Sequence, residues 1–470
     1  LSSNGVSVAA TTFDITNIVI AGGLAPAGTN SAIPASGVAS NYIFNDQFTN
    51  PGNTQLTVQY TIIPISAGSC AGDPVIVVIT VDPEPVLSAT LDRTVCSDTP
   101  GGIVLNTNGV SVGAANYNIT NIAVSGGLLP KVGNATISNG VATNYLANDQ
   151  FTNTTNASLT VTYSVVPVSA SGCLGNPVDV ILTIDPEPVI DPALATKSIC
   201  SREISNLILN TNGSSVAAAS YNISLVSQDA GLTGVPTVGN GLAANAIVND
   251  NFTNVTTTPL KVIYQVVPVS AAGCLGDPFI VTITVNAEPV VNPALDNTVC
   301  SDEISGIILS TNGTSIAAGS YRLVNVVVPG TITASGTNVA VGSTGGINLI
   351  RNDKYSNATN ANVIVTYEVR GISPLGCEGV SEFIDLTINP APTMSPGSAN
   401  LCSDVPSGII VGPAAGSATT TQFELKGIVK APALVAGGSN AALGTYPANL
   451  AGGQSDFLIN DTFTNTTNGP

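Results

Sequence analysis

A six-residue block recurs five times along the 470-residue chain, and its regular spacing constrains the fold more than any other feature. It reads NDQFTN at 45–50 and 148–153, NDNFTN at 249–254, NDKYSN at 352–357 and NDTFTN at 460–465. Its aspartates, which are 103, 101, 103 and 108 residues apart, are Asp46, Asp149, Asp250, Asp353 and Asp461. Because a single domain rarely exceeds about 250 residues, this period predicts a row of similar domains.

Each copy carries the same motifs in the same order. A proline-rich joint (DPEP at 82–85) is followed by a cysteine block, an Asn-Gly turn, an aromatic residue, the NDQFTN-like block, a long strand and a second cysteine. With the joints as boundaries, we define repeat 1 to repeat 5 as residues 1–83, 84–186, 187–287, 288–390 and 391–470. Repeats 1 and 5 are partial, so we expect the sequence to be a section of a longer array.

The strand before the second cysteine gives the fold class. In SLTVTYSVVPVS, Leu159, Val161, Tyr163 and Val165 alternate with polar residues, which predicts a strand with one buried face. Many short strands and frequent turns in about 100 residues indicate an immunoglobulin-like β-sandwich. We therefore predict an all-β chain of tandem sandwiches. Their short prolyl joints act as semi-rigid spacers, which makes the array an elongated rod.

The NDQFTN-like block has two interpretations. Asp and Asn side chains cap turns by bonding nearby backbone, and the central aromatic alternates with polar neighbours as a core anchor would. We expect a structural corner in which the aromatic, rather than the aspartate, is buried; a ligand or ion site is the alternative. The corner residues are Asp46, Phe48, Asp149, Phe151, Asp250, Phe252, Asp353, Tyr355, Asp461 and Phe463.

Eight cysteines at two per period predict disulfides and an oxidising compartment. Two pairings respect the repeat. The one we favour lies within each repeat and uses Cys96–Cys173, Cys200–Cys274 and Cys300–Cys377. The other spans each joint and uses Cys70–Cys96, Cys173–Cys200, Cys274–Cys300 and Cys377–Cys402. A straight first strand that carries Cys96 to the far end of its repeat would argue against the favoured scheme.

The composition excludes several functions. The chain has no histidine, which removes Ser-His-Asp and Cys-His catalysis, so we predict no catalytic residues and no enzyme. A net charge of −18 with only 11 Lys and Arg residues argues against binding to nucleic acid. No apolar run is long enough for a transmembrane helix, and we expect no membrane insertion.

We expect no cofactor and no metal, although calcium between repeats is the serious alternative. Its candidate ligands are Asp82 with Glu84, or Asp185 with Glu187, together with a turn aspartate. The joint aspartate is replaced by asparagine at two later joints, which is unexpected if every joint held an ion.

The order VCSD, TNG, NDQFTN, VVPVSASGCLGNP and TIDPEP resembles the PKD-like repeats of very large Bacteroidota surface proteins, such as the SprB-type gliding-motility adhesins. The resemblance implies an extracellular cell-surface filament, exported by the type 9 secretion system and used for attachment and gliding. It also implies that partners, namely motility machinery and external surfaces or glycans, bind through regions outside this sequence.

The favoured interpretation is a passive, non-enzymatic stalk that projects an adhesive tip. Two alternatives are repeats that themselves bind glycans or surfaces, and a spacer array in a secreted multidomain enzyme. Binding repeats should share exposed aromatic residues, whereas the recurrent aromatics here alternate into the predicted cores.

Overall fold

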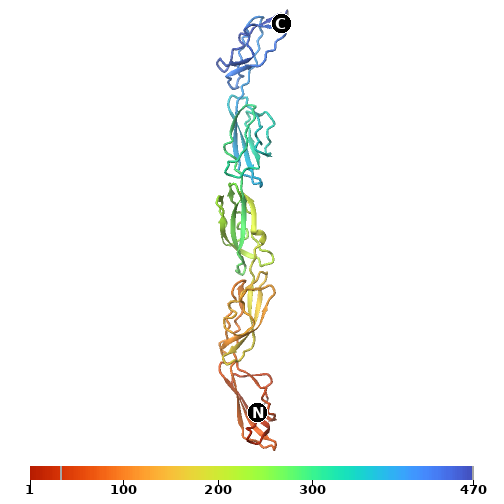
Figure 1. Cartoon of the computed structure of the whole chain (residues 1–470), viewed down its shortest axis with the longest axis vertical. Coiled ribbons are helices and arrows are strands. Elements are labelled where there is room, and N and C mark those ends of the chain that lie inside the picture. The colour runs from red at the N-terminus through yellow and green to blue at the C-terminus, as the bar shows by residue number, and fades with distance from the viewer. Residues whose placement is uncertain (32–33, 468–470) are drawn as a thin grey trace.

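The computed structural model describes residues 1–31 and 34–467 as a row of β-domains placed end to end. The N- and C-termini lie at opposite ends of this rod (Figure 1). The part of the chain that the structure describes has no α-helix, and one short 3₁₀ helix, η1 (Pro192–Ala195), precedes the first strand of repeat 3. The predicted all-β fold class is confirmed.

Repeat 2 shows the complete unit. Its main sheet has the order β10 (Ser138–Val141), β8 (Ala114–Val124), β12 (Leu159–Ser169), β13 (Val178–Asp185) and β7 (Arg93–Cys96). A two-stranded sheet of β9 (Leu129–Pro130) and β11 (Phe151–Thr152) accompanies it. All neighbours are antiparallel except β7, which runs parallel to β13.

Repeats 3 and 4 follow the same plan. The main sheet of repeat 3 consists of β14 (Thr196–Cys200), β20 (Phe279–Asn286), β19 (Leu260–Ser270), β15 (Ala218–Gln228) and β17 (Gly239–Leu242), and its small sheet of β16 (Leu232–Thr233) and β18 (Thr253–Asn254). In repeat 4 these are β21 (Asn297–Cys300), β27 (Glu382–Asn389), β26 (Val363–Ile372), β22 (Ser320–Val327) and β24 (Thr344–Gly345), with β23 (Thr333–Ala334) and β25 (Tyr355–Ser356).

Repeats 1 and 5 have smaller sheets. Repeat 1 has a four-stranded sheet of β3 (Ala35–Val38), β1 (Ala10–Ile20), β5 (Leu56–Ser66) and β6 (Val75–Val81), and a pair formed by β2 (Ala25–Ala27) and β4 (Gln47–Thr49). Repeat 5 has two pairs, β28 (Gln422–Leu425) with β30 (Gly444–Pro447), and β29 (Leu434–Ala436) with β31 (Phe463–Asn465). In repeat 1, β6 therefore forms the edge of its sheet.

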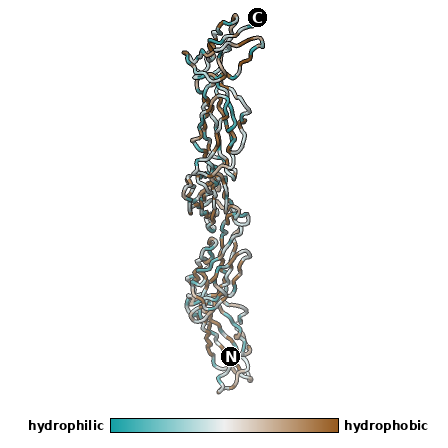
Figure 2. The backbone as a smooth tube through the Cα atoms, turned by 45° about the horizontal axis from the view of Figure 1, so that its top comes forward, coloured by the Kyte–Doolittle hydropathy of each residue, from teal (hydrophilic) through white to brown (hydrophobic). Residues whose placement is uncertain are grey.

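Each complete repeat has its own hydrophobic core. Val161, Tyr163 and Val165 of β12 are fully buried, and the polar residues between them are only partly buried, as the period-two pattern predicts. The equivalent residues of β19 and β26 are buried in separate cores of repeats 3 and 4. Polar and apolar residues are interspersed along the rod (Figure 2). Because each complete repeat has its own core, the main functional question is what joins the repeats to one another.

Candidate functional site at the joints between repeats

Two disulfide bonds connect neighbouring repeats. Cys96 of repeat 2 bonds Cys274 of repeat 3, with Cα atoms 5.3 Å apart. Cys200 of repeat 3 bonds Cys377 of repeat 4, with Cα atoms 5.4 Å apart. In both bonds the first cysteine of one repeat is linked to the second cysteine of the next repeat. We call this arrangement the staple.

Both pairings expected from the sequence are wrong, and the parallel strand β7 is the reason. Its register places Cys96 opposite Asp185, at the end of the repeat that leads into the next joint. Cys173 follows β12 in a turn whose backbone bonds Ser169, at the opposite end of the same repeat. A long strand therefore separates the two cysteines that the favoured pairing would join.

Four cysteines are not in disulfides, including two that the sequence interpretation expected to be bonded. Cys173 is partly buried, and Cys70, Cys300 and Cys402 are exposed. The staple rule accounts for all four. The rule pairs Cys173 with a first cysteine in repeat 1 and Cys300 with a second cysteine in repeat 5, and residues 1–83 and 391–470 contain neither. The rule would pair Cys70 and Cys402 with cysteines of repeats outside this sequence.

Backbone hydrogen bonds cross the joints in a pattern that recurs from repeat to repeat. The carbonyl of the last asparagine in each NDQFTN-like block accepts from a joint N–H at 2.9–3.0 Å; the pairs are Glu84–Asn50, Glu187–Asn153, Glu288–Asn254 and Ala391–Asn357. A second bond follows the Asn-Gly turn at three joints, where Val112 donates to Gly52, Val216 to Thr155 and Ile316 to Thr256. These three joints therefore share one geometry.

Asn153 is a structural hub that the sequence interpretation missed. It is fully buried, and its Nδ2 donates to the carbonyls of Ala157 at 2.9 Å and Ile184 at 2.8 Å. Its Oδ1 accepts from Thr155, while its own N–H donates to Ser97. Asn254 and Asn357 make equivalent bonds. The signal was present in the sequence, since all five blocks end in asparagine.

The glycine after the second cysteine lets the joint pass close to the turn. A Cβ built on Gly276 would lie 1.9 Å from the Pro188 carbonyl oxygen, and the corresponding distance at Gly175 is 2.0 Å to that of Pro85. No side chain fits there, because real Cβ atoms do not approach backbone so closely. The glycine thus brings the second cysteine next to the joint, where the staple forms.

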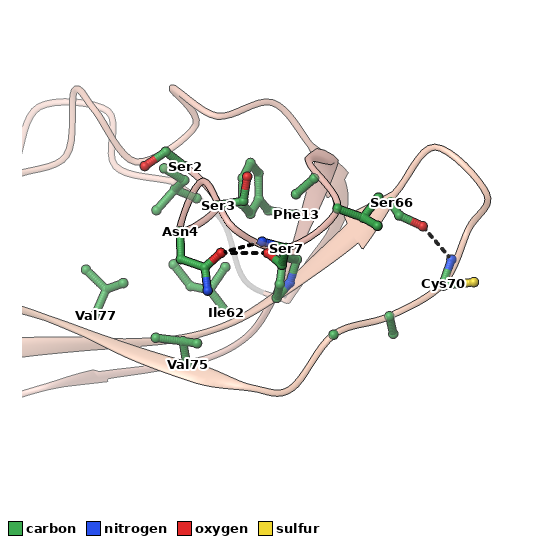
Figure 3. A pocket seen from close by; sticks show the side chains of 16 residues that line it. Ser2, Ser3, Asn4, Ser7, Phe13, Ile62, Ser66, Cys70, Val75 and Val77 are labelled. Carbon is green, nitrogen blue, oxygen red and sulfur yellow. Dashed lines mark hydrogen bonds between the residues drawn. The ribbon is translucent and has the colours of Figure 1, made fainter.

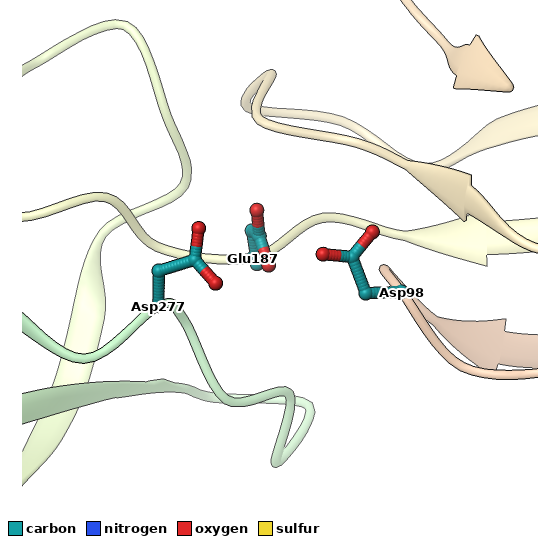
Figure 4. Close-up of side chains that lie close together, drawn as sticks. All are labelled: Asp98, Glu187 and Asp277. Carbon is teal, nitrogen blue, oxygen red and sulfur yellow. The ribbon is translucent and has the colours of Figure 1, made fainter. Parts of the chain in front are cut away.

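Three carboxylates meet at the joint between repeats 2 and 3. Ligand atoms of Asp98, Glu187 and Asp277 all lie within 4.8 Å of one another (Figure 4). Burial raises the pKa of the Glu187 carboxyl to about 7, and the nearby charges of Asp98 and Asp277 add to this rise. Lys131 lies 3.0 Å from Asp98 and offsets part of the negative charge.

The next joint has a different charge pattern. Arg202 takes the position of Asp98 and pairs with the buried Glu288 at 2.8 Å. Of the carboxylates considered for calcium, only Glu187 belongs to a cluster: Asp185 accepts from Ser158 and Asp82 from Gln55. The staple therefore recurs at both joints, whereas the carboxylate cluster does not.

The NDQFTN-like blocks form corners, but the aspartates are buried together with the aromatics. Asp149 is 2% exposed; its Oδ2 accepts from the Tyr163 hydroxyl at 2.7 Å and its Oδ1 from the Ala135 N–H at 2.8 Å. Our expectation that only the aromatic would be buried is wrong. The carboxylate ties the long strand to a surface loop, and burial raises the pKa of both Asp149 and Tyr163.

In the other blocks the tyrosine of the long strand has a similar but not identical partner. Tyr264 donates to Asp250 at 2.5 Å and Tyr60 to Asp46 at 2.7 Å, while Tyr367 donates to the Tyr355 hydroxyl at 3.4 Å. The aromatics Phe151, Phe252 and Tyr355 are buried, as are Asp353 and Asp461. In the partial repeats, Asp46, Phe48 and Phe463 are only half-buried.

Comparison with known proteins agrees with this architecture. Three segments match the model of the PKD-like domain: residues 29–85, 129–188 and 197–289. No curated protein matches the chain. In the described part of the chain, we find no helix with the length and apolar character needed to span a membrane.

Among solved structures, human CDH23 EC21-23 is 14% identical, with a TM-score of 0.23, over 65% of this chain and 99% of that one. The surface layer protein SbsC, domains 4-9, is 13% identical, with a TM-score of 0.17, over 98% of this chain and 69% of that one. At these TM-scores the similarities carry no inference about function.

Proposed function

We propose that this chain is a passive, non-enzymatic section of an extracellular filament, whose PKD-like repeats are stapled to one another by disulfides. The observation that carries the proposal is the pair of bonds Cys96–Cys274 and Cys200–Cys377, which cross successive joints under one rule. A hydrogen bond contributes only about 1 kcal/mol, so the few bonds at a joint would yield under load. A covalent bond beside the joint resists bending and separation of the repeats.

The finer features of this role follow the sequence resemblance. We propose that the filament stands on the cell surface, is exported by the type 9 secretion system, and serves attachment and gliding motility. Its motor and its external ligands bind outside these repeats. The net charge of −18 fits a filament section that does not associate with itself, because like-charged chains repel one another.

A scattering and binding experiment on the whole chain tests the proposal. The oxidised chain should keep one extended maximum dimension in solution, and mild reduction should broaden the distribution of dimensions. The same chain, immobilised and exposed to a panel of glycans, should bind none in a saturable manner. Saturable glycan binding would contradict a passive role and favour the adhesive alternative.

A further inference from the structure

The joint between repeats 3 and 4 contains a small cleft with a mostly polar lining. Side chains of both repeats line it, including Ser201, Arg202, Glu288, Arg370, Glu378 and Ser381. A larger groove in repeat 1 differs in kind, because apolar side chains such as Phe13, Ile62 and Val77 form much of its wall (Figure 3). The cleft has a volume of about 260 Å³, below the about 300–1,000 Å³ of sites for drug-sized ligands, so it suits a small ion.

Glu288 provides a buried hydrogen-bond acceptor in this cleft. The residue is 1% exposed, and its Oε1 accepts from Nε of Arg202 at 2.8 Å. Its Oε2 is also buried, and it has no hydrogen-bond partner among the residues that the structure describes. Because a buried carboxylate oxygen without a donor costs free energy, a ligand that brings a hydroxyl group to Oε2 stabilises this joint.

Two arginines supply donors to the same cleft. Nε of Arg202 is bonded to Glu288, and its terminal nitrogens have no partner in the described part of the chain. Nε of Arg370 donates to Ser381 at 2.9 Å, and one of its terminal nitrogens lies 3.8 Å from Glu378. Both arginine side chains are nearly half exposed, so their ends are accessible to an ion. The planar guanidinium group matches the geometry of phosphate oxygens.

The arrangement of charges beside the cleft also favours an anion. Arg322 of β22 lies opposite Arg370 of β26, whereas the corresponding pair in repeat 3 is Asn222 and Val267. Like charges directly opposite each other destabilise a pair of strands. Glu378 is one carboxylate shared by the two arginines, at 2.8 Å from Arg322 and 3.8 Å from Arg370. A further anion beside Arg370 therefore offsets the remaining repulsion.

We propose that this cleft binds a hydrogen phosphate ion. The hydroxyl of the ion donates to Oε2 of Glu288, and its anionic oxygens accept from the terminal nitrogens of Arg202 and Arg370. Inorganic phosphate retains a hydroxyl at neutral pH, whereas sulfate has no proton to donate and meets the Glu288 carboxylate as a like charge. Because Arg202 belongs to repeat 3 and Arg370 to repeat 4, the ion bridges two repeats that the Cys200–Cys377 staple also joins.

Isothermal titration calorimetry of the whole oxidised chain, in a phosphate-free buffer of constant ionic strength, tests the proposal. Titration with sodium phosphate should show one saturable site per chain. Sodium sulfate should bind at least about tenfold more weakly, because it leaves the buried oxygen without a donor. Absence of saturable phosphate binding, or equal affinity for the two ions, would overturn the proposal.

The Glu288→Gln variant tests the assigned acceptor. Its amide keeps an oxygen for Nε of Arg202 and places an N–H donor at the position of Oε2. Sulfate should therefore bind this variant at least as tightly as phosphate does. An unchanged preference for phosphate would contradict the role of Glu288 in recognition of the hydroxyl.

A pair of arginine variants separates the site from the general charge of the chain. Arg370→Val introduces the residue that repeat 3 has at the corresponding position, and it should weaken phosphate binding by at least about tenfold. Arg351→Val is the matched control, because Arg351 is exposed in the same repeat and does not line the cleft. Equal losses in the two variants would overturn the assignment. Neither result depends on whether the staples stiffen the filament.

Discussion

Cys96 of repeat 2 is bonded to Cys274 of repeat 3, although 178 residues separate them in sequence. The bond is possible because the first strand of one repeat ends where the last turn of the next repeat begins. The same relation holds one repeat later for Cys200 and Cys377. The protein thus uses its cysteines to hold the joints, and the cores of the repeats depend on apolar burial.

Disulfide mapping should confirm the staple rule. Proteolysis of the oxidised chain, followed by mass spectrometry without reduction, should yield the linked pairs Cys96–Cys274 and Cys200–Cys377. The Cys274→Ser variant should lose the first pair and retain the second, because the two bonds lie at different joints. Linkage of Cys96 to Cys173 would show that the pairing lies within repeats.

Alanine at Gly276 should disrupt the joint between repeats 2 and 3. The new Cβ would lie 1.9 Å from the Pro188 carbonyl oxygen, and such overpacking typically destabilises by about 1–3 kcal/mol. The yield of Cys96–Cys274 after oxidative refolding should fall. Gly72→Ala is the matched control, because the nearest atom to its Cβ would be Cγ of the Pro64 side chain, at 3.0 Å, and the nearest backbone atom the Pro64 carbonyl oxygen, at 3.6 Å. An equal effect of the two substitutions would argue against a tightly packed joint.

Removal of the Tyr163 hydroxyl should destabilise repeat 2. In Tyr163→Phe the buried Asp149 loses a 2.7 Å hydrogen bond, which costs about 1–3 kcal/mol. Hydrogen exchange of the β12 amides should accelerate, while exchange in repeat 4 should not change. Tyr145→Phe provides a control, since its hydroxyl bonds lie at the surface, at 3.3 Å. A change below that of the control would mean that the Asp149 contact contributes little.

The joint between repeats 2 and 3 should weaken as the pH rises. The pKa of Glu187 is raised from 4.5 to about 7, so the folded state binds more protons than the unfolded state between these values. Stability from this group is therefore fully present below about pH 4.5 and is lost as the pH rises to about 7. The free energy of unfolding should fall by roughly 1–2 kcal/mol over this range. This is less than the full pKa shift of Glu187 implies, because Asp277 of the cluster is exposed to solvent.

The Glu187→Gln variant isolates that effect. Its thermal midpoint should lie above that of the natural chain at pH 8, and the difference should shrink toward pH 5. The midpoint should be measured in both proteins across this range, so that titration of other groups cancels. A difference that does not depend on pH would show that the Glu187 charge does not govern this joint.

Much of the fold could be predicted from the sequence because the repeat states each pattern several times. The alternation around Tyr163 identified a half-buried strand, and the structure has β12 at Leu159–Ser169. The staple could not be predicted, because it depends on the direction of β7. A short first strand can pair parallel or antiparallel with the last strand, and four residues do not reveal which.

The burial of Asp149 was missed for a related reason. An aspartate beside an asparagine is typical of a solvated turn. The Tyr163 hydroxyl that stabilises it comes from a strand 14 residues later, and a local reading of the block does not include that contact. The carboxylate cluster also joins residues of two repeats, at positions 98, 187 and 277, that come together only when the repeats are stacked.

If disulfides hold the joints straight, the bending of each joint in electron micrographs of the full chain shows it most directly. The chain contains its own control, because two of its joints are stapled and the joints flanking them, next to repeats 1 and 5, are not. We expect a narrower range of bend angles at the stapled joints, and this range should widen to match the others after reduction. Equal ranges at all four joints before and after reduction would contradict it.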